Sequence, residues 1–224
     1  MDFVITEDGS KTIFNAQIGE HYHSTHGAVQ ESRHVFLKSG LQFLLNSKGI
    51  SQVTSLSVLE IGFGTGLNFL LTADYCIQEA IPLNYTGIEA FPLSINMIKE
   101  TGYEQEIALS LWHSFLTKYE QVLVHRQTLE AQITLEIAHQ DVIDFNSQQR
   151  YDLIYFDAFA ANRQPEMWSE ATLAHVCQFL KPGGVFVTYA ITGNLKRTMK
   201  SLGFSIEKAP GAPGKREMLR AVKF

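Results

Sequence analysis

Asp157 ends an apolar segment, residues 151–156, and is followed by small residues, by Phe159 and by a turn that leads to Trp168. A carboxylate at the tip of a buried strand can hold an ammonium group and accept its proton, and an amine attacks an electrophile only when it is unprotonated. An amine with a pKa of about 10 is neutral in roughly one molecule in a thousand at pH 7, so such a carboxylate assists the attack. The stretch therefore indicates either an acidic site for amine chemistry or an ordinary strand, loop and helix cap.

A glycine-rich turn follows an earlier strand segment. Residues 62–66 read Gly-Phe-Gly-Thr-Gly, between the segment 57–61 and a helix that opens at Leu67. Glycines at such a turn allow a tight bend and let backbone N–H groups approach a ligand. A dinucleotide fingerprint would need Gly or Ala in place of Leu67, which disfavours a nicotinamide cofactor. With Glu60 at its head, E-x-G-x-G-x-G instead resembles the first motif of the class I S-adenosylmethionine-dependent methyltransferases.

Two further carboxylates follow the next two strand segments. Glu89 ends the segment YTGIE, where an acid can accept hydrogen bonds from both hydroxyl groups of a ribose. Asp141 follows ITLEIAHQ, where its side chain can accept an adenine amino group. Either residue alone is explained by a surface acid at a strand end. In this order, they predict an adenosyl-binding crevice at the carboxyl ends of parallel strands, with Asp157 facing the sulfonium end of the cofactor.

The pattern around these residues predicts a doubly wound α/β fold. From Leu56 onward, short apolar β-rich runs alternate with helical stretches, as in a parallel sheet covered on both faces. We expect the Rossmann-like fold of class I methyltransferases, with a mostly parallel seven-stranded sheet. Residues 204–208 and 217–223 are predicted to form a C-terminal antiparallel hairpin.

The domain organisation follows from the same pattern. Residues 1–50 are predicted to form an N-terminal extension or lid that contributes to the pocket, with a helix over Val35 to Leu45, and residues 51–224 the methyltransferase domain. The stretch from Gly102 to Thr128 is expected to be helical.

Composition favours a cytoplasmic globular protein. Of the 224 residues, 45% are hydrophobic and 18% charged, and we expect neither a membrane span nor a secretory signal. Cys76 and Cys177 suit two reduced thiols better than a disulfide framework. Residues 181–224 carry nine Lys/Arg against two Glu, a net charge of +7, which leaves −12 for the rest of the chain. This asymmetry indicates either a solvated face or contact with a polyanion.

Longer motifs carry a more specific resemblance. Residues 156–160 (F-D-A-F-A) and 165–168 (P-E-M-W) resemble F-D-[GA]-F-A-P and N-P-x-M-W of the tRNA 5-aminomethyl-2-thiouridine methyltransferases. The same domain forms the N-terminal half of the bifunctional tRNA 5-methylaminomethyl-2-thiouridine biosynthesis proteins. Residues 31–36 (E-S-R-H-V-F), 62–69 (G-F-G-T-G-L-N-F) and 215–219 (K-R-E-M-L) match further motifs of that family in the same order. Many members have proline where Ala161 stands and a lysine near Asn162-Arg163.

The resemblance implies methyl transfer from S-adenosylmethionine to the exocyclic amine of 5-aminomethyl-(2-thio)uridine at the wobble position of tRNA. It implies a tRNA anticodon stem-loop as partner and leaves the oligomeric state open. The sequence shows no second glycine fingerprint, so we expect the flavin-dependent oxidase half of the bifunctional proteins to be absent.

The resemblance also assigns roles to individual residues. Asp157 is the expected catalytic residue and also contacts the cofactor. The other expected cofactor-binding residues are Glu60, Gly62, Gly64, Gly66, Asn68, Glu89, Ala90, Asp141 and Val142. The expected substrate-pocket residues are Tyr22, Glu31, Arg33, Phe159 and Trp168. The expected RNA contacts are Arg163, Lys196, Arg197, Lys215 and Arg216, for which solvated surface cations are the alternative.

Other functions remain open at this point. His21, His23 and His26 lack a Cys or carboxylate at a familiar ligand spacing, so we expect no metal. An aminopropyltransferase-like enzyme that alkylates a free polyamine would also end a strand on a catalytic Asp. A non-catalytic RNA-binding scaffold is the third hypothesis, but it gives no reason for the glycine loop together with Glu89, Asp141 and Asp157.

Overall fold

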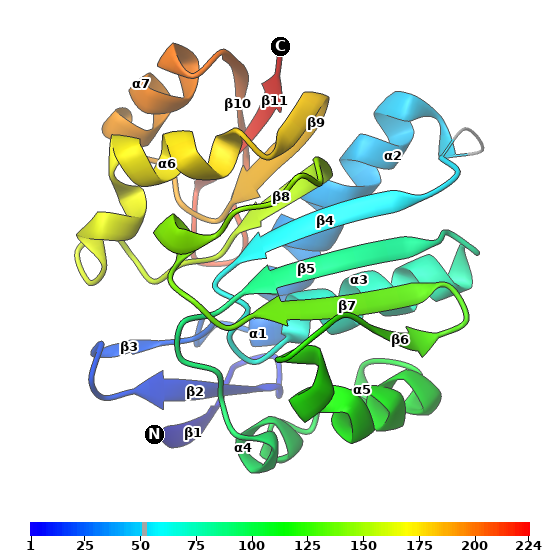
Figure 1. Cartoon of the computed structure of the whole chain (residues 1–224). Coiled ribbons are helices and arrows are strands. Elements are labelled where there is room, and N and C mark those ends of the chain that lie inside the picture. Colours follow the sequence, from blue (N-terminus) through cyan, green and yellow to red (C-terminus); the bar gives the residue numbers. More distant parts are fainter. Residues whose placement is uncertain (51–52) are drawn as a thin grey trace.

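The computed structural model describes residues 1–50 and 53–224 (Figure 1). Within these residues, two sheets are present, one of three and one of eight strands. The strands are β1 (Asp2–Ile5), β2 (Lys11–Asn15), β3 (Glu20–His21), β4 (Leu56–Ile61), β5 (Leu83–Ile88), β6 (Gln127–Glu130), β7 (Ile133–Ala138), β8 (Tyr151–Phe156), β9 (Leu180–Thr188), β10 (Phe204–Pro210) and β11 (Glu217–Lys223).

Helices connect most of the strands of the large sheet. The α-helices are α1 (Ala28–Ser32), α2 (Phe43–Lys48), α3 (Leu67–Gln78), α4 (Ile95–Glu100), α5 (Leu109–Val122), α6 (Glu170–Cys177) and α7 (Gly193–Ser201). A π-helical segment, η1 (Arg33–Gln42), joins α1 to α2, and short 3₁₀ turns are η3 (Tyr103–Gln105), η4 (Val142–Asp144) and η5 (Pro165–Trp168). No helix in the part of the chain described here is long and apolar enough to cross a membrane.

The large sheet has the order β10-β11-β9-β8-β4-β5-β7-β6. The five strands from β9 to β7 in this order are mutually parallel, whereas β11 runs antiparallel to both β9 and β10, and β6 runs antiparallel to β7. Every residue of β4 and β8 is buried, as expected for central strands covered on both faces. The predicted doubly wound fold and its C-terminal hairpin are confirmed.

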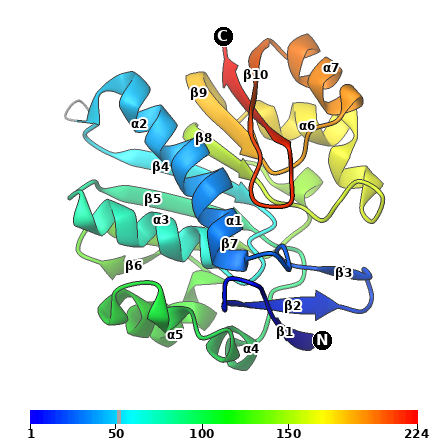
Figure 2. The same ribbon diagram turned by 180° about the vertical axis from the view of Figure 1, so that it is seen from behind.

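Helices cover both faces of this sheet. The continuous helix α1–η1–α2 packs with α3 and α5 against one face, in a core that includes Val58, Tyr85 and Tyr155. Helices α6 and α7 pack with η4 against the other face, in a core that includes Ile154 and Phe186. Figure 1 views the sheet from the α6 and α7 side, and Figure 2 views it from the α3 side.

The structure differs from the predicted elements in three places. The sheet has one strand more than the seven expected, because the end of the stretch predicted as helical, residues 102–128, belongs to β6. The helix expected over Val35–Leu45 extends over residues 28–48. Residues 1–21 contain the antiparallel sheet β1-β2-β3. The domain boundary expected at residue 51 lies outside the described residues, and the division into 1–50 and 51–224 stays a prediction.

Candidate active site

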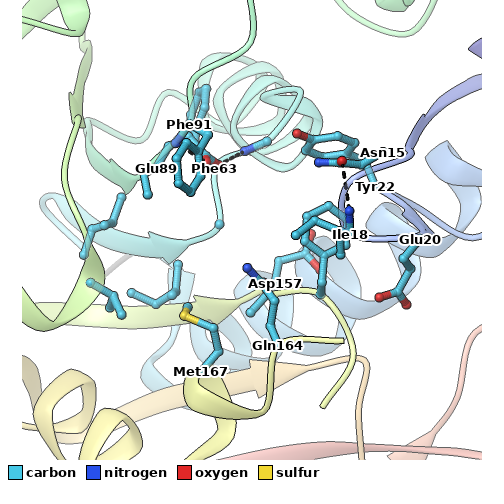
Figure 3. A pocket seen from close by; sticks show the side chains of 18 of the residues that line it. Asn15, Ile18, Glu20, Tyr22, Phe63, Glu89, Phe91, Asp157, Gln164 and Met167 are labelled. Carbon is cyan, nitrogen blue, oxygen red and sulfur yellow. Dashed lines mark hydrogen bonds between the residues drawn. The ribbon is translucent and has the colours of Figure 1, made fainter. Parts of the chain in front are cut away.

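A cavity of about 940 Å³ lies at the carboxyl ends of the central strands. Residues that directly follow β4, β5, β8 and β9 line it, together with Asp141 beyond β7 and residues from β3 and the β10–β11 turn. Figure 3 shows Glu89 and Phe91 on one side of the cavity and Tyr22 and Ile18 on another, with Asp157 between them. The strand tips predicted to meet do therefore meet at one cavity.

The glycine loop after β4 forms part of the cavity wall. Gly62 and Gly64 line the cavity and have φ angles of +80° and +53°, in the left-handed region that favours glycine. A Cβ atom at Gly62 would lie 2.6 Å from the backbone carbonyl oxygen of Asp157, and one at Gly64 would lie 3.0 Å from the Tyr22 ring. The loop thus needs glycine for its backbone angles and for its close packing. Gly66, with φ +80°, is the N-cap of α3 and does not line the cavity.

Glu89 lies at the tip of β5 and fixes the glycine loop. Its carboxylate accepts hydrogen bonds from the backbone N–H of Gly64 and from that of Phe91, each at 2.9 Å. A carboxylate held by two backbone donors keeps further lone pairs for hydroxyl groups of a ligand. Ala90 lines the cavity beside it.

The residues beyond β7 form a second part of the same wall. Asp141 is exposed and lines the cavity, and its Oδ1 accepts the backbone N–H of Ile143 at 3.0 Å as the N-cap of η4. Val142 is buried and also lines the cavity. The exposed side chains of Phe91 and Ile143 flank this part of the cavity and offer apolar surface for a flat ring.

Asp157 lies at the tip of β8 and is held from behind by Asn68. The side-chain amide of Asn68 donates to Oδ2 of Asp157 at 2.8 Å. Burial, together with the nearby negative charge of Glu31, raises the pKa of Asp157 to about 8, although the Asn68 hydrogen bond and the positive charge of Lys215 act in the opposite direction. Asp157 therefore binds a proton far more tightly than an ordinary aspartate.

Glu60 and Asn68, which the sequence predicts as cofactor contacts, do not line the cavity. Glu60 is 0% and Asn68 4% exposed, so Asn68 and Asp157 separate Glu60 from the cavity. Asn68 donates to Oε1 of Glu60 at 2.8 Å, and the hydroxyl of Tyr85 donates to Oε2 at 2.8 Å. Glu60 points into the core because side chains alternate between the two faces along β4.

The predicted substrate-pocket residues divide into two groups. Tyr22, Glu31 and Phe159 line the cavity, and the Tyr22 and Phe159 rings meet edge to face with centroids 5.1 Å apart. Arg33 does not line the cavity and pairs with Glu106 at 3.0 Å. Trp168 does not line it either, and its indole donates to the carbonyl oxygen of Phe159 at 2.8 Å.

Lys215 is in the cavity wall, although the sequence indicated an RNA contact. Its Nζ pairs with Oε1 of the buried Glu31 at 2.8 Å and lies 4.0 Å from the centroid of the Tyr189 ring. In the part of the chain that the structure describes, Lys215 is the only Lys or Arg that lines the cavity. The other predicted RNA contacts, Arg163, Lys196, Arg197 and Arg216, do not line it.

Glu20 and Tyr189 also line the cavity, and sequence reasoning predicted neither of them. Glu20, from β3, accepts the backbone N–H of Ala160 at 2.9 Å. Tyr189 follows β9 and donates from its hydroxyl to the carbonyl oxygen of Ala158 at 2.9 Å. Both hold the loop after Asp157, and no local motif signals either contact. The position of Tyr189 directly after a parallel strand was the one usable signal.

Of the three histidines near the N-terminus, His21 and His23 line the cavity and His26 does not. The described residues contain no group of three or more His, Cys, Asp or Glu side chains placed to hold a metal ion. Burial lowers the pKa of His23 to about 4, and His26 contacts Glu7 at 3.0 Å near the surface.

Comparisons with known proteins place the chain in a family. Residues 103–224 match a family model described as S-adenosyl-L-methionine-dependent methyltransferase. The chain is 31% identical over 205 residues to the tRNA 5-methylaminomethyl-2-thiouridine biosynthesis bifunctional protein MnmC of Leptospira borgpetersenii serovar Hardjo-bovis (strain JB197), covering 88% of this chain and 31% of that protein. The chain thus spans about a third of the length of the curated relatives it matches.

Solved structures share the fold. The crystal structure of MNMC2 from Aquifex aeolicus matches with a TM-score of 0.79 and 22% identity, covering 99% of this chain and 70% of that chain. Magnesium protoporphyrin IX methyltransferase (ChlM) from Synechocystis PCC 6803, crystallised with bound SAM, matches with a TM-score of 0.55 and 13% identity, covering 88% of this chain and 81% of that chain. On its family match, its fold and its glycine-lined cavity, this chain belongs to the S-adenosyl-L-methionine-dependent methyltransferases.

Proposed function

We propose that the enzyme methylates the exocyclic amine of 5-aminomethyl-(2-thio)uridine at the wobble position of tRNA, giving 5-methylaminomethyl-(2-thio)uridine. The observation that carries the proposal is the acidic cavity around Asp157. Glu20 and Glu31 line the same cavity, and both raise the affinity of Asp157 for a proton. A group of carboxylates with one lysine among them favours a cationic substrate such as a protonated primary amine. The names of the curated relatives point to the same substrate.

The residues of the cavity fit the cofactor of the family. Glu89 is proposed to accept the ribose hydroxyls, Asp141 and Val142 to contact the adenine, and Gly62 and Gly64 to let the backbone approach the methionine part. The left-handed glycine angles and the contacts that a Cβ atom would make support this assignment. S-adenosylmethionine supplies an electrophilic methyl group on a sulfonium.

Asp157 is proposed to act on the amine. In its ionised form it holds the ammonium by charge and accepts the proton that the nitrogen loses, so that the nitrogen lone pair is free to attack. A pKa raised from 3.8 to about 8 comes within about two units of that of an amine, so this proton transfer is far less unfavourable than transfer to an ordinary aspartate. Tyr22 and Phe159 form an aromatic wall beside it, suited to stacking on a uracil ring. Residues 1–50 act in this proposal as a wall or lid, because Glu20, Tyr22 and Glu31 reach the cavity from that segment.

The anticodon stem-loop is proposed to lie across the mouth of the cavity. Arg163, Lys196, Arg197 and Arg216 are the proposed phosphate contacts, since none of them forms an ion pair with an acid of the described residues. Contacts of this kind make RNA affinity fall steeply with salt. A tRNA substrate also implies a cytoplasmic enzyme.

A free polyamine is the second candidate substrate, because the acidic cavity would suit any small cation. The test is transfer of labelled methyl groups to tRNA that carries 5-aminomethyluridine, followed by nucleoside mass analysis, with spermidine and putrescine as parallel acceptors. Label in 5-methylaminomethyluridine supports the proposal, and label in a polyamine alone refutes it.

The role of Asp157 is tested in the same assay. Asp157→Ala is expected to lower turnover by about 10²–10⁴-fold, the usual contribution of a general base. Its affinity for S-adenosylmethionine, measured by calorimetry, should stay within a few-fold. Glu170→Gln is the matched control, because Glu170 is an exposed acid at the start of α6. Equal turnover of the two variants would exclude the assigned role.

A further inference from the structure

A single side-chain amide bridges two carboxyl groups behind the cavity. The Nδ2 of Asn68 lies 2.8 Å from Oε1 of Glu60 and 2.8 Å from Oδ2 of Asp157. The three residues come from β4, from α3 and from the tip of β8. An amide NH₂ has two hydrogens, so Asn68 donates one to each carboxyl group.

Glu60 has no cation to balance a negative charge. It is completely buried, and its two hydrogen bonds come from Asn68 and from the hydroxyl of Tyr85. None of the ion pairs in the described part of the chain includes it. An unpaired buried carboxylate is costly, which favours the protonated form of the carboxyl group. Burial, with the nearby charges of Asp157 and Glu89, raises the pKa of Glu60 well above its usual range.

Within the described part of the chain, the side-chain oxygen of Asn68 makes no hydrogen bond that could orient the amide. Its Oδ1 is buried and has no hydrogen-bond partner among the described residues. An unsatisfied buried oxygen is unfavourable, so the orientation of the amide is determined by its two carboxyl acceptors. Neither Asn68 nor Glu60 reaches the cavity in which the cofactor is expected.

We propose that Asn68 and Glu60 form a buried positioning unit for Asp157 and do not contact the cofactor. The amide of Asn68 holds Oδ2 of Asp157, which leaves Oδ1 for the reacting amine. Glu60 bears a proton and fixes the other hydrogen of the amide without adding a second negative charge behind the site. The statement about the amine rests on the proposed function, whereas the statement about the three side chains does not.

Two substitutions separate the parts of this unit. In Glu60→Gln, a neutral side chain of the same shape can accept from Asn68, while the Tyr85 hydroxyl changes from donor to acceptor, so we expect the titration of Asp157 to stay unchanged. In Asn68→Leu, Asp157 loses a donor that favours its charged form, so its titration should move to higher pH. Turnover should fall by about 10²-fold in Asn68→Leu, the lower end of the contribution of a general base.

The titration is measured by carbon NMR on protein labelled at the Asp and Glu carboxyl carbons, between pH 4 and 10 and without RNA. The groups near Asp157 are Glu31, Asn68, Lys215, Glu20, Glu60 and Tyr189. Glu31 raises the pKa of Asp157, so Glu31→Gln is recorded as a reference that should lower this pKa. Calorimetry with S-adenosylmethionine is expected to give Kd values within a few-fold of the parent for Glu60→Gln and Asn68→Leu.

Two results would overturn the proposal. A fall of about one unit or more in the pKa of Asp157 in Glu60→Gln would mean that Glu60 carries a charge in the parent protein. A loss of cofactor affinity in Asn68→Leu with an unchanged titration would make Asn68 a cofactor contact. If Asn68→Leu does not fold, the Glu60→Gln titration still decides the question. Failure of tRNA methylation with the expected titrations would reject the substrate and leave the positioning unit in place.

Discussion

Replacing Asp157 by Asn is expected to stabilise the fold, and to do so more as the pH rises. The pKa of Asp157 is raised from 3.8 to about 8 in the folded protein. The folded state therefore holds the proton more tightly than the unfolded chain, so its stability is highest below about pH 4 and falls as the pH rises to about 8. An asparagine has no proton to lose, and its Oδ1 can still accept the Asn68 hydrogen bond.

The magnitude follows from these two pKa values. At about 1.4 kcal/mol per pH unit, the interval from 3.8 to about 8 corresponds to a ceiling of about 6 kcal/mol. Asp157 is partly open to the cavity, where water lowers the penalty. We therefore expect Asp157→Asn to gain about 2–3 kcal/mol at pH 8 and close to nothing at pH 4.5, measured by urea unfolding.

Asp152 on the same strand is the matched control with the opposite sign. Burial would raise its pKa, but hydrogen bonds from Lys181, Ser57 and Lys48 outweigh burial and lower the pKa to about 2. Asp152 therefore stabilises the fold above about pH 4, and this contribution is lost as the pH falls towards 2. Asp152→Asn should lose about 2 kcal/mol at pH 8. Equal stability changes for Asp157→Asn at pH 4.5 and pH 8 would refute the reasoning.

Three further variants test the remaining parts of the site. Glu89→Ala removes the carboxylate that accepts hydrogen bonds from two backbone N–H groups. The variant should bind S-adenosylmethionine about 10–100-fold more weakly in calorimetry. Unchanged affinity would exclude Glu89 as a ribose contact. Gly62→Ala would place a Cβ atom 2.6 Å from a backbone oxygen, whereas Gly203 has a similar φ angle and open space around it. Gly62→Ala should therefore lower the free energy of unfolding by about 2 kcal/mol more than Gly203→Ala. Equal losses in the two variants would contradict the steric argument. Lys215→Met leaves the buried carboxylate of Glu31 without its ion pair and should lower the free energy of unfolding by about 1–2 kcal/mol, measured with urea. Lys208→Met removes an exposed ion pair with Glu217, 4.0 Å apart, and should cost less than about 0.5 kcal/mol. Similar costs would show that the buried pair adds nothing.

The sequence predicted the residues at the strand ends better than the side chains that surround them. Parallel strands bring their carboxyl ends to one edge, so the positions of Gly62, Glu89, Asp141 and Asp157 follow from strand order alone. The direction of a side chain beyond a strand does not follow from strand order. Trp168 was expected to wall the pocket, but it turns back to a backbone oxygen.

The ion pair of Lys215 depends on a contact between distant segments of the chain. In the sequence, Lys215 is one of several cations in a basic region, and its pairing with Glu31 depends on how the C-terminal hairpin meets the helix that begins at Ala28.

The sequence analysis missed the short strand β6, which has four residues and an irregular register against β7, because so short a segment shows little periodicity. The π-helical segment η1 likewise has no sequence signature of its own.

The ion pair between Glu31 and Lys215 joins residues that lie 184 positions apart in the chain, and this separation affects how the protein folds. During synthesis Glu31 leaves the ribosome before Lys215, so the growing chain carries Glu31 without its partner over the intervening residues. The lysine arrives on the turn between β10 and β11, and β11 inserts between β10 and β9 at one side of the sheet. Closing so long a loop is slow, because its entropy is lost before the contact forms. The charge pattern of the cavity therefore depends on a non-local contact, and it is complete only when β11 has taken its place between β10 and β9.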